Sequence, residues 1–279
     1  MANSAFKRRK ITNVIVLGLT IFSTVIGIGF LFWILGVLIY NGVSAISLDI
    51  FTVDGAPPGM EPSGLRHAIV GHLMLTVFAT FIGVPMGLLA GTYLNEYGQN
   101  SFFANLIRDL SDIMMSAPSI VIGVFVYGIL VMPIGHFSGW AGSAALAIIM
   151  IPIIIRTTDD MLKLVPQALR EAAFALGAPK WKVVIQIVYK GALTGITTGV
   201  LLGVARVAGE TAPLLFTAFS NNFYSTDMMQ PISSITVTMF NYAMSPFEDW
   251  QSIGWASAAI LAFAILTINI FGRVIIRKK

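Results

Sequence analysis

Long apolar runs without charge alternate with short charged segments along the chain. Runs that contain no Asp, Glu, Lys or Arg cover 11–48, 67–95, 113–155, 191–205, 211–226 and 250–272. A bilayer-crossing helix needs about 20 mainly apolar residues, and these runs lack the period-two alternation of half-buried strands. Because lipid offers no hydrogen-bond partners, a spanning backbone must satisfy its own polar groups, which favours helices. The pattern predicts six spans, near 13–40, 68–93, 113–132, 140–156, 192–217 and 251–272.

The predicted fold is therefore all-α and polytopic, with six transmembrane helices. The run 113–155 is long enough for two short spans, which turn-forming residues at 133–139 would separate. The apolar run after "KRRK" is longer than a secretory-signal core, so we expect an uncleaved anchor. The expected divisions are a tail at 1–12, a first span and loop at 13–66, a core at 67–272 containing a polar segment at 164–190, and a tail at 273–279.

Composition agrees with a membrane protein and excludes several kinds of chemistry. Only 11% of the residues are charged, whereas soluble domains carry about 25%. The chain has no cysteine, which excludes disulfides, thiol catalysis and cysteine-based metal sites. No His or carboxylate spacing matches a metal site, and no cofactor is expected. The net charge of +4 does not indicate nucleic-acid binding, because the basic residues flank the spans.

The distribution of basic residues predicts the orientation. Lys and Arg prefer the cytoplasmic side of a membrane. They are concentrated in both termini and in the segment between spans four and five, whereas the opposite loops, 41–66, 133–139 and 218–250, hold only Arg66. We therefore expect both termini to be cytoplasmic. The loops 41–66 and 218–250 are either plain connectors or a docking surface outside the cell.

The segment 164–190, "LVPQALREAAFALGAPKWKVVIQIVYK", is too polar to span. Its first part, from Gln167 to Leu176, is built from good helix formers. Gly177 suits a left-handed C-terminal cap, and Pro179 suits the first turn of a second helix. The segment thus predicts a helix–turn–helix hairpin at the cytoplasmic face.

Two interpretations of this hairpin remain open from its residues alone. It is either an amphipathic interfacial element without a partner, or a docking element for another protein. Ala172 and Ala173 are small enough to let another surface approach closely, and Glu171 is available to a basic partner.

The stretch "RVAGETAPLLF" places two charges inside an apolar run. Arg206 and Glu210 are four residues apart, close enough to interact on one helix face. Ionisable residues in a span are costly and often functional. Glycines at four-residue spacing mark faces where helices pack closely, as in the series Gly191, Gly195, Gly199 and Gly203 and in the series Gly83, Gly87 and Gly91.

We expect the Arg206–Glu210 pair to point into protein or a water-filled pathway. It is either a structural ion pair or an anion site in which the guanidinium fork of Arg206 binds an oxyanion such as phosphate. Thr211, next to Glu210, joins these two as a candidate pathway residue. Other polar candidates are weaker: His72 is expected to be a packed interior residue, and His67 and His136 are expected to be solvated near the outer interface.

The motif "EAAFALG" followed by Ile187 resembles the coupling motif of permeases from ATP-binding cassette (ABC) importers. The matching residues are Glu171, Ala172, Ala173, Gly177 and Ile187, whereas the final Leu-Pro of that motif is replaced by Tyr189 and Lys190. The resemblance implies that the hairpin sits in a cleft of an ATP-hydrolysing subunit. Since the chain has no phosphate-binding Gly-x-x-x-x-Gly-Lys-Ser/Thr loop, we expect no enzymatic activity here and ATP hydrolysis on a separate partner.

The stretches 132–140, 153–182 and 206–232 are similar to the A-type membrane permeases of bacterial high-affinity phosphate importers, the Pst system. This resemblance implies a type I ABC importer permease in the bacterial inner membrane that translocates inorganic phosphate. It also implies a heterodimer with a second homologous permease, two copies of an ATP-binding subunit and a periplasmic phosphate-binding protein, with Arg206 and Glu210 at the charged positions of the fifth span. The alternatives are a permease for another oxyanion or small solute, and a membrane receptor or sensor that transports nothing.

Overall fold

The computed structural model describes the backbone of residues 2–98 and 101–277, and every regular element in these ranges is a helix. Lys278 and Lys279 of the predicted basic tail lie outside the described residues. The elements are, in order, α1 (Ala2–Ser44), α2 (Asp49–Thr52), α3 (Arg66–Thr92), the π-helix η1 (Tyr93–Tyr97), α4 (Phe102–Ser116), α5 (Ser119–Val126), the π-helix η2 (Tyr127–Val131), α6 (Met132–Ile134), α7 (Gly139–Lys163), α8 (Gln167–Ala175), α9 (Lys180–Val183), the π-helix η3 (Val184–Val188), α10 (Tyr189–Ala208), α11 (Ala212–Leu215), α12 (Ile235–Ala243) and α13 (Glu248–Arg277).

The long helices confirm an all-α membrane protein. Five of them are long and apolar enough to cross a bilayer: Phe6–Ser44, Arg66–Tyr97, Gly139–Lys163, Lys180–Ala208 and Glu248–Ile270. A sixth span is reached only when α4 and the helix Ser119–Ile134 are counted together, and these two are bent by 106°.

The predicted third span, 113–132, is therefore wrong at its start. Residues 113–116 still belong to α4, and the spanning helix begins at Ser119. The reason is Pro118, which pushes the preceding residue out of the helical region. Ala117 accordingly has φ −67° and ψ 138°. The helix α4 thus forms an elbow that enters the third span.

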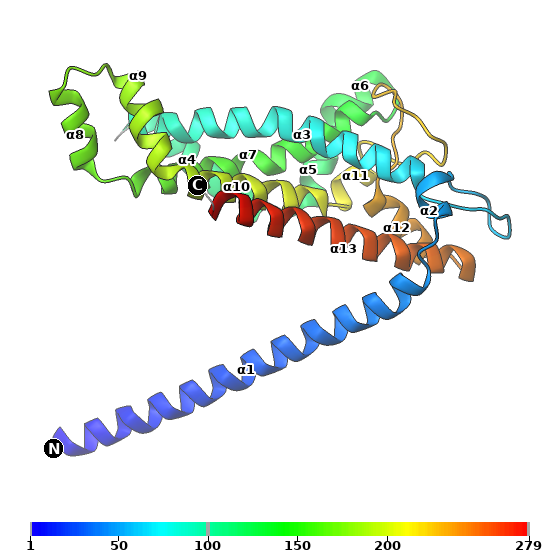
Figure 1. The fold of residues 1–279 in the computed structure, drawn as a ribbon, viewed down its shortest axis with the longest axis horizontal. Coiled ribbons are helices and arrows are strands. Elements are labelled where there is room, and N and C mark those ends of the chain that lie inside the picture. Colours follow the sequence, from blue (N-terminus) through cyan, green and yellow to red (C-terminus); the bar gives the residue numbers. More distant parts are fainter. Residues whose placement is uncertain (1, 99–100, 278–279) are drawn as a thin grey trace.

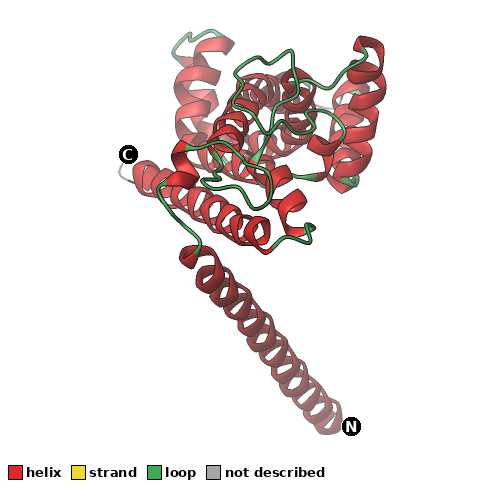
Figure 2. Ribbon diagram, turned by 90° about the vertical axis from the view of Figure 1, so that its right-hand side faces the viewer, coloured by secondary structure: helices red, strands yellow, loops and turns green. Residues whose placement is uncertain are grey.

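The spanning helices form a bundle with two different ends (Figure 1). The hairpin of α8 and α9 lies at one end, here called the hairpin end, and α2, α6 and α12 lie at the opposite end. The start of α1 and the C-terminal end of α13 both lie toward the hairpin end. Figure 2, seen from the opposite end, shows the loops that cover the bundle there and α1 projecting away from it.

The helix α1 touches the bundle only near its C-terminal end. Its 43 residues extend about 65 Å at the α-helical rise, more than the apolar thickness of a bilayer. At Gly42, an added Cβ would lie 2.5 Å from Ala259 Cβ of α13. The most apolar window of α1 is entirely exposed, so this helix presents its apolar surface to whatever surrounds the chain.

The centre of the bundle is the contact between α3 and α7. Both helices supply residues to the largest buried cluster, which includes Leu75, Leu146 and Met150. The helices approach closely along the predicted glycine series of α3. A Cβ added at Gly87 would lie 2.6 Å from Ile154 Cβ, and one at Gly91 would lie 2.7 Å from Thr158 Cβ.

The second glycine series packs α10 against the other side of α7. A Cβ at Gly199 would lie 2.6 Å from Thr157 Oγ1, and Gly195 faces the Met161 side chain in the same way. Both predicted glycine ridges therefore meet α7, which lies between α3 and α10.

The hairpin at 164–190 forms as predicted in its first half. The helix α8 ends at Ala175, and Gly177 has the left-handed φ of 77° expected of a C-terminal cap. The second arm begins after Pro179 and runs through η3 into α10 without a break, so that Lys180–Ala208 is one helix. The predicted start of span five at 192 is therefore too late.

The opposite end holds structure that the sequence did not predict. Most of α12 is buried, although it lies in the presumed loop 218–250. Ser234 caps it by accepting a hydrogen bond from the Val237 N–H at 3.2 Å. His67 was expected to be solvated but is only 2% exposed, and its Nδ1 accepts a hydrogen bond from the Gly55 N–H.

The α3–α7 contact predicts a sharp sensitivity to side-chain size. Replacing Gly91 with Val should lower the free energy of unfolding by about 1–3 kcal/mol, because a Cβ there overlaps Thr158 and the Ile155 carbonyl. Thermal unfolding of the purified chain in detergent measures this change. Gly18→Val is the matched control, since no atom lies within 4 Å of a Cβ at Gly18. Equal melting temperatures for the two variants would contradict the close contact.

Candidate functional site

The predicted fifth span, 192–217, is not one continuous helix. The helix α10 ends at Ala208, and α11 begins only at Ala212. Between them the Gly209 N–H bonds the Arg206 carbonyl at 3.1 Å, as in a tightened last turn. The physical cause is Pro213, which lacks an N–H and would clash with the carbonyl four residues earlier, at Gly209. The break places Glu210 and Thr211 outside regular helix.

Arg206 and Glu210 are paired across this break, but loosely. Arg206 Nε lies 3.9 Å from Glu210 Oε1, beyond ordinary hydrogen-bond distance. Among the described residues, this is the one polar contact of the Arg206 side chain. The side chain of Arg206 is 53% exposed in the single chain, whereas that of Glu210 is 15% exposed. The guanidinium therefore keeps donors available for another group.

The backbone at the break is held from α12. The Thr236 hydroxyl donates to the Glu210 carbonyl oxygen at 2.9 Å, and Thr236 itself lies 3.0 Å from the Ser234 hydroxyl. A carbonyl freed by a helix break needs such a partner inside a membrane. The contact fixes the position of Glu210 relative to the opposite end of the bundle.

Thr211 lies beside a cavity of about 550 Å³. The cavity is formed mainly by α12 and α13, and its other lining residues are Met239, Phe240, Ala243, Gln251, Gly254, Trp255 and Ala258. Apart from Thr211 and Gln251 the lining side chains are apolar. The structure thus brings Arg206, Glu210 and Thr211 together at one break, with Arg206 exposed and Thr211 facing a largely apolar space.

The predicted coupling residues lie on the surface of the hairpin. Glu171, Ala172 and Gly177 are exposed. Ala173 is half-buried and packs against a small apolar cluster at the base of the hairpin. Leu176, at the end of α8, is 89% exposed. Leu176 is therefore an apolar side chain that the end of α8 leaves uncovered in the single chain.

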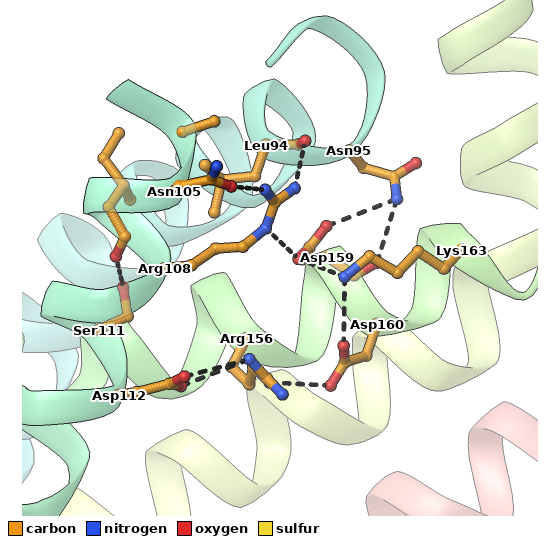
Figure 3. A network of polar contacts seen from close by, with 12 residues as sticks. Leu94, Asn95, Asn105, Arg108, Ser111, Asp112, Arg156, Asp159, Asp160 and Lys163 are labelled. Carbon is orange, nitrogen blue, oxygen red and sulfur yellow. Dashed lines mark hydrogen bonds and ion pairs between the residues drawn. The ribbon is translucent and has the colours of Figure 1, made fainter. Parts of the chain in front are cut away.

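A buried charge network at the hairpin end was missed by the sequence analysis (Figure 3). Asp159 of α7 is 1% exposed and accepts from Arg108 of α4 at 3.1 Å and from Lys163 at 2.6 Å. Arg108 also donates to the Leu94 carbonyl in η1 at 2.7 Å. The network joins η1, α4 and α7. Only the pair Asp159–Lys163 has a local spacing, because Arg108 and Leu94 come from distant segments.

A second group of charged side chains in Figure 3 lies around Arg156. Arg156 contacts Asp112 at 3.4 Å and Asp160 at 3.2 Å, and all three side chains are largely exposed. This cluster also bridges α4 and α7, but from the outside. The elbow formed by α4 is therefore held against α7 by charged side chains.

The sequence matches one protein family over most of its length. Residues 83–278 match the family described as binding-protein-dependent transport system inner membrane component. The chain is 51% identical over 277 residues to the phosphate transport system permease protein PstA of Haemophilus influenzae, with 99% of this chain and 98% of the relative covered. It is 50% identical over 275 residues to the protein of the same name from Yersinia pestis, covering 99% and 92% of the two chains.

Solved structures of ABC transporters share the fold. An inward-facing structure of the MetNI methionine ABC transporter matches with a TM-score of 0.64 at 20% identity, over 77% of this chain and 95% of that chain. A bacterial ABC transporter involved in the import of the acidic polysaccharide alginate matches with a TM-score of 0.66 at 14% identity, over 90% and 92% of the two chains.

The charge network predicts that Asp159 contributes far more to stability than its exposed counterpart. Asp159→Ala leaves Arg108 without its buried partner and should cost about 3 kcal/mol. Asp112→Ala removes only an exposed partner of Arg156 and should cost less than about 1 kcal/mol. Thermal unfolding of both variants in the same detergent compares the two costs. Similar losses of unfolding free energy in the two variants would mean that burial does not increase the contribution of Asp159 to stability.

Proposed function

Because this chain belongs to the family of binding-protein-dependent transport system inner membrane components and is a permease subunit of a phosphate ABC importer, we propose that it forms one half of the phosphate pathway. The relatives favour phosphate over another oxyanion and a transport role over a receptor without transport. The second half would come from a second, homologous permease subunit in a heterodimer.

Arg206 carries this proposal. Its side chain lies in a spanning helix, is 53% exposed in the single chain and is only loosely paired with Glu210. An arginine facing lipid is costly, so such residues normally face protein or water. A second permease placed over this surface would enclose Arg206 in a pathway, where its planar fork of donors matches the oxygens of phosphate.

We assign Glu210 and Thr211 supporting roles at the same place. Glu210 holds the guanidinium on one side and leaves the other side for the anion. Its negative charge also opposes a fully ionised phosphate, which favours a protonated substrate or a shift of the pair when phosphate binds. Thr211 adds a hydroxyl that both donates and accepts hydrogen bonds.

ATP hydrolysis is assigned to a separate subunit, present in two copies. The chain has no phosphate-binding loop of its own, and the hairpin offers an exposed surface around Glu171, Ala172 and Gly177. In the proposed importer the hairpin docks on the ATP-binding subunit, and a periplasmic phosphate-binding protein delivers phosphate to the opposite end.

The proposed location is the bacterial inner membrane, with both termini in the cytoplasm. The start of α1, the end of α13 and the hairpin lie toward the same end of the molecule (Figure 1). That end carries most of the basic residues, whereas the opposite loops carry one, Arg66. Because cytoplasmic segments are enriched in Lys and Arg, this distribution supports the proposed orientation.

Removing the charged guanidinium of Arg206 should abolish most phosphate transport. In the assembled importer, Arg206→Gln should lower phosphate uptake about 10- to 100-fold, the loss expected for charge-assisted hydrogen bonds. Arg206→Lys keeps the charge but not the fork, and should retain part of the uptake. Uptake of radiolabelled phosphate into proteoliposomes measures both.

Arg156→Gln is the control for the Arg206 variants, because Arg156 is also an exposed, ion-paired arginine of a spanning helix. It should transport phosphate as the unmodified chain does. Co-purification of the ATP-binding subunit verifies assembly in each case. An assembled Arg206→Gln importer with normal uptake would rule out the assigned site.

Reversing the charge of Glu171 should weaken the coupling between ATP hydrolysis and phosphate transport. Glu171→Lys places a positive charge on the exposed hairpin, where the proposed function puts the ATP-binding subunit, so phosphate-dependent stimulation of ATP hydrolysis and uptake should both fall. Gln186→Lys adds the same charge at another exposed position of the second arm and should change neither. Normal stimulation and uptake in the Glu171 variant would exclude the hairpin as the coupling element.

A further inference from the structure

Both arms of the hairpin hold the same point at the end of α3. Arg170 of α8 donates from Nη2 to Glu96 Oε1 at 2.9 Å, and both side chains are nearly buried, at 11% and 7% exposed. Lys180, the first residue of α9, binds the Glu96 carbonyl oxygen and lies 4.4 Å from the centre of the Tyr97 ring. Glu96 and Tyr97 belong to η1, which continues α3 at the hairpin end.

Arg170 also ties the hairpin to the end of α7. Its guanidinium donates to the Leu162 carbonyl oxygen at 2.9 Å and to the Val165 carbonyl oxygen. These carbonyls lie at the C-terminal end of α7, where a cation is favourable. One side chain therefore joins α3, α7 and α8. Because a buried charge that loses its partner is strongly unfavourable, this arrangement tolerates little relative movement of the three helices.

The rest of the hairpin has few such anchors. Its base rests on an apolar cluster that includes Leu162, Val183 and Val188. Glu171 on α8 is exposed, as are Leu176 and Gly177 at the tip of the hairpin. A force applied to the tip reaches the bundle through the base and, on the polar side, through Arg170 and Lys180. Both of these residues lead to α3.

The far end of α3 leads toward Glu210. A Cβ atom at Gly71 would overlap the Ser233 carbonyl oxygen, so α3 packs directly on the segment before α12. The first turn of α12 contains Thr236, whose hydroxyl holds the Glu210 carbonyl. A continuous series of packed and hydrogen-bonded residues thus links the hairpin, α3, the start of α12 and the break beside Arg206.

We propose that Arg170 and Lys180 are positioning residues that attach the hairpin to the end of α3. Movement of the hairpin would then pass through α3 to the segment that holds Glu210. The inference rests on the proposed function of the hairpin as the contact with the ATP-binding subunit. It adds the helix through which the movement passes and the side chains that attach the hairpin to it.

The test uses the complete importer in proteoliposomes and counts phosphate molecules imported per ATP hydrolysed. Arg170→Met should lower this ratio by about 10-fold, near the upper end of couplings carried by single side chains, while ATP hydrolysis persists. Arg170→Lys keeps the pair with Glu96 and should restore part of the ratio. Glu96→Gln alone should also lower the ratio. Adding Glu96→Gln to Arg170→Met should cause little further loss, because both changes remove the same Arg170–Glu96 interaction.

Lys180 provides a second variant that leaves the buried pair intact. Lys180→Met should lower the ratio by about threefold, a coupling of the smaller size seen for single contacts, and it decides the question if Arg170→Met fails to assemble. Lys182→Met is the matched control, since Lys182 is exposed and lies over its neighbour Trp181; it should import phosphate with an unchanged ratio.

The outcomes separate this inference from the proposed function. If Glu171→Lys uncouples the importer while assembled Arg170→Met and Lys180→Met importers keep the normal ratio, the hairpin is the coupling element and the proposed attachment to α3 is wrong. Additive losses from Glu96→Gln and Arg170→Met would also overturn it. Normal coupling in the Glu171 variant overturns the proposed hairpin function and this inference together.

Discussion

The close packing of α3 on α7 is the constraint on which the other features depend. Gly87 and Gly91 let the two helices approach until an added Cβ would overlap α7, and Gly83 leaves room only for a tight contact with Met150. Lipid provides little hydrophobic drive for helices to associate, so such van der Waals contact is a main source of stability in a membrane bundle. No polar pathway fits between helices this close. The charged pairs described above lie at the hairpin end of this helix pair and on α10, which packs on the other side of α7.

Different kinds of buried polar group are satisfied at the two ends of this helix pair. At the hairpin end, Asp159 and Glu96 are buried carboxylates, and each is matched by an arginine from another segment. Burying a carboxylate is acceptable only when a charged partner and further hydrogen bonds accompany it. At the opposite end, the polar group is a carbonyl freed by the break before Pro213, and the neutral hydroxyl of Thr236 is sufficient to satisfy it. Charge therefore anchors the hairpin end, whereas hydroxyl groups hold the break.

Features that depend on local sequence were predictable, and features that depend on tertiary contact were not. The spacing of charges predicted the spans, and the cap at Gly177 predicted the first arm of the hairpin. The start of the third span was placed too early because the apolar character continues through Ile113–Ser116, where only Pro118 signals the turn. The predicted fifth span, 192–217, likewise ran through the break after Ala208, although Pro213 is its local cause.

The candidate site shows the same division. The i, i+4 spacing predicted that Arg206 and Glu210 would be neighbours, and the structure pairs them. The sequence carried no sign that Thr236 would hold Glu210, because these residues are 26 positions apart. Glu96 and Arg170 are 74 positions apart, so their pairing required the fold.

In the proposed pathway, the loose contact between Arg206 and Glu210 suits transport of an anion rather than its storage. A site that transports must bind its solute well enough to admit it and weakly enough to release it. A guanidinium with no counter-charge would retain phosphate, whereas one held tightly by a carboxylate would not admit it. At 3.9 Å, Glu210 lies between these limits. Its position is set by Thr236, at the start of the helix that follows the segment packed on α3. A small displacement of that segment would therefore change the distance between the two charges and, in the proposed function, the affinity of Arg206 for phosphate.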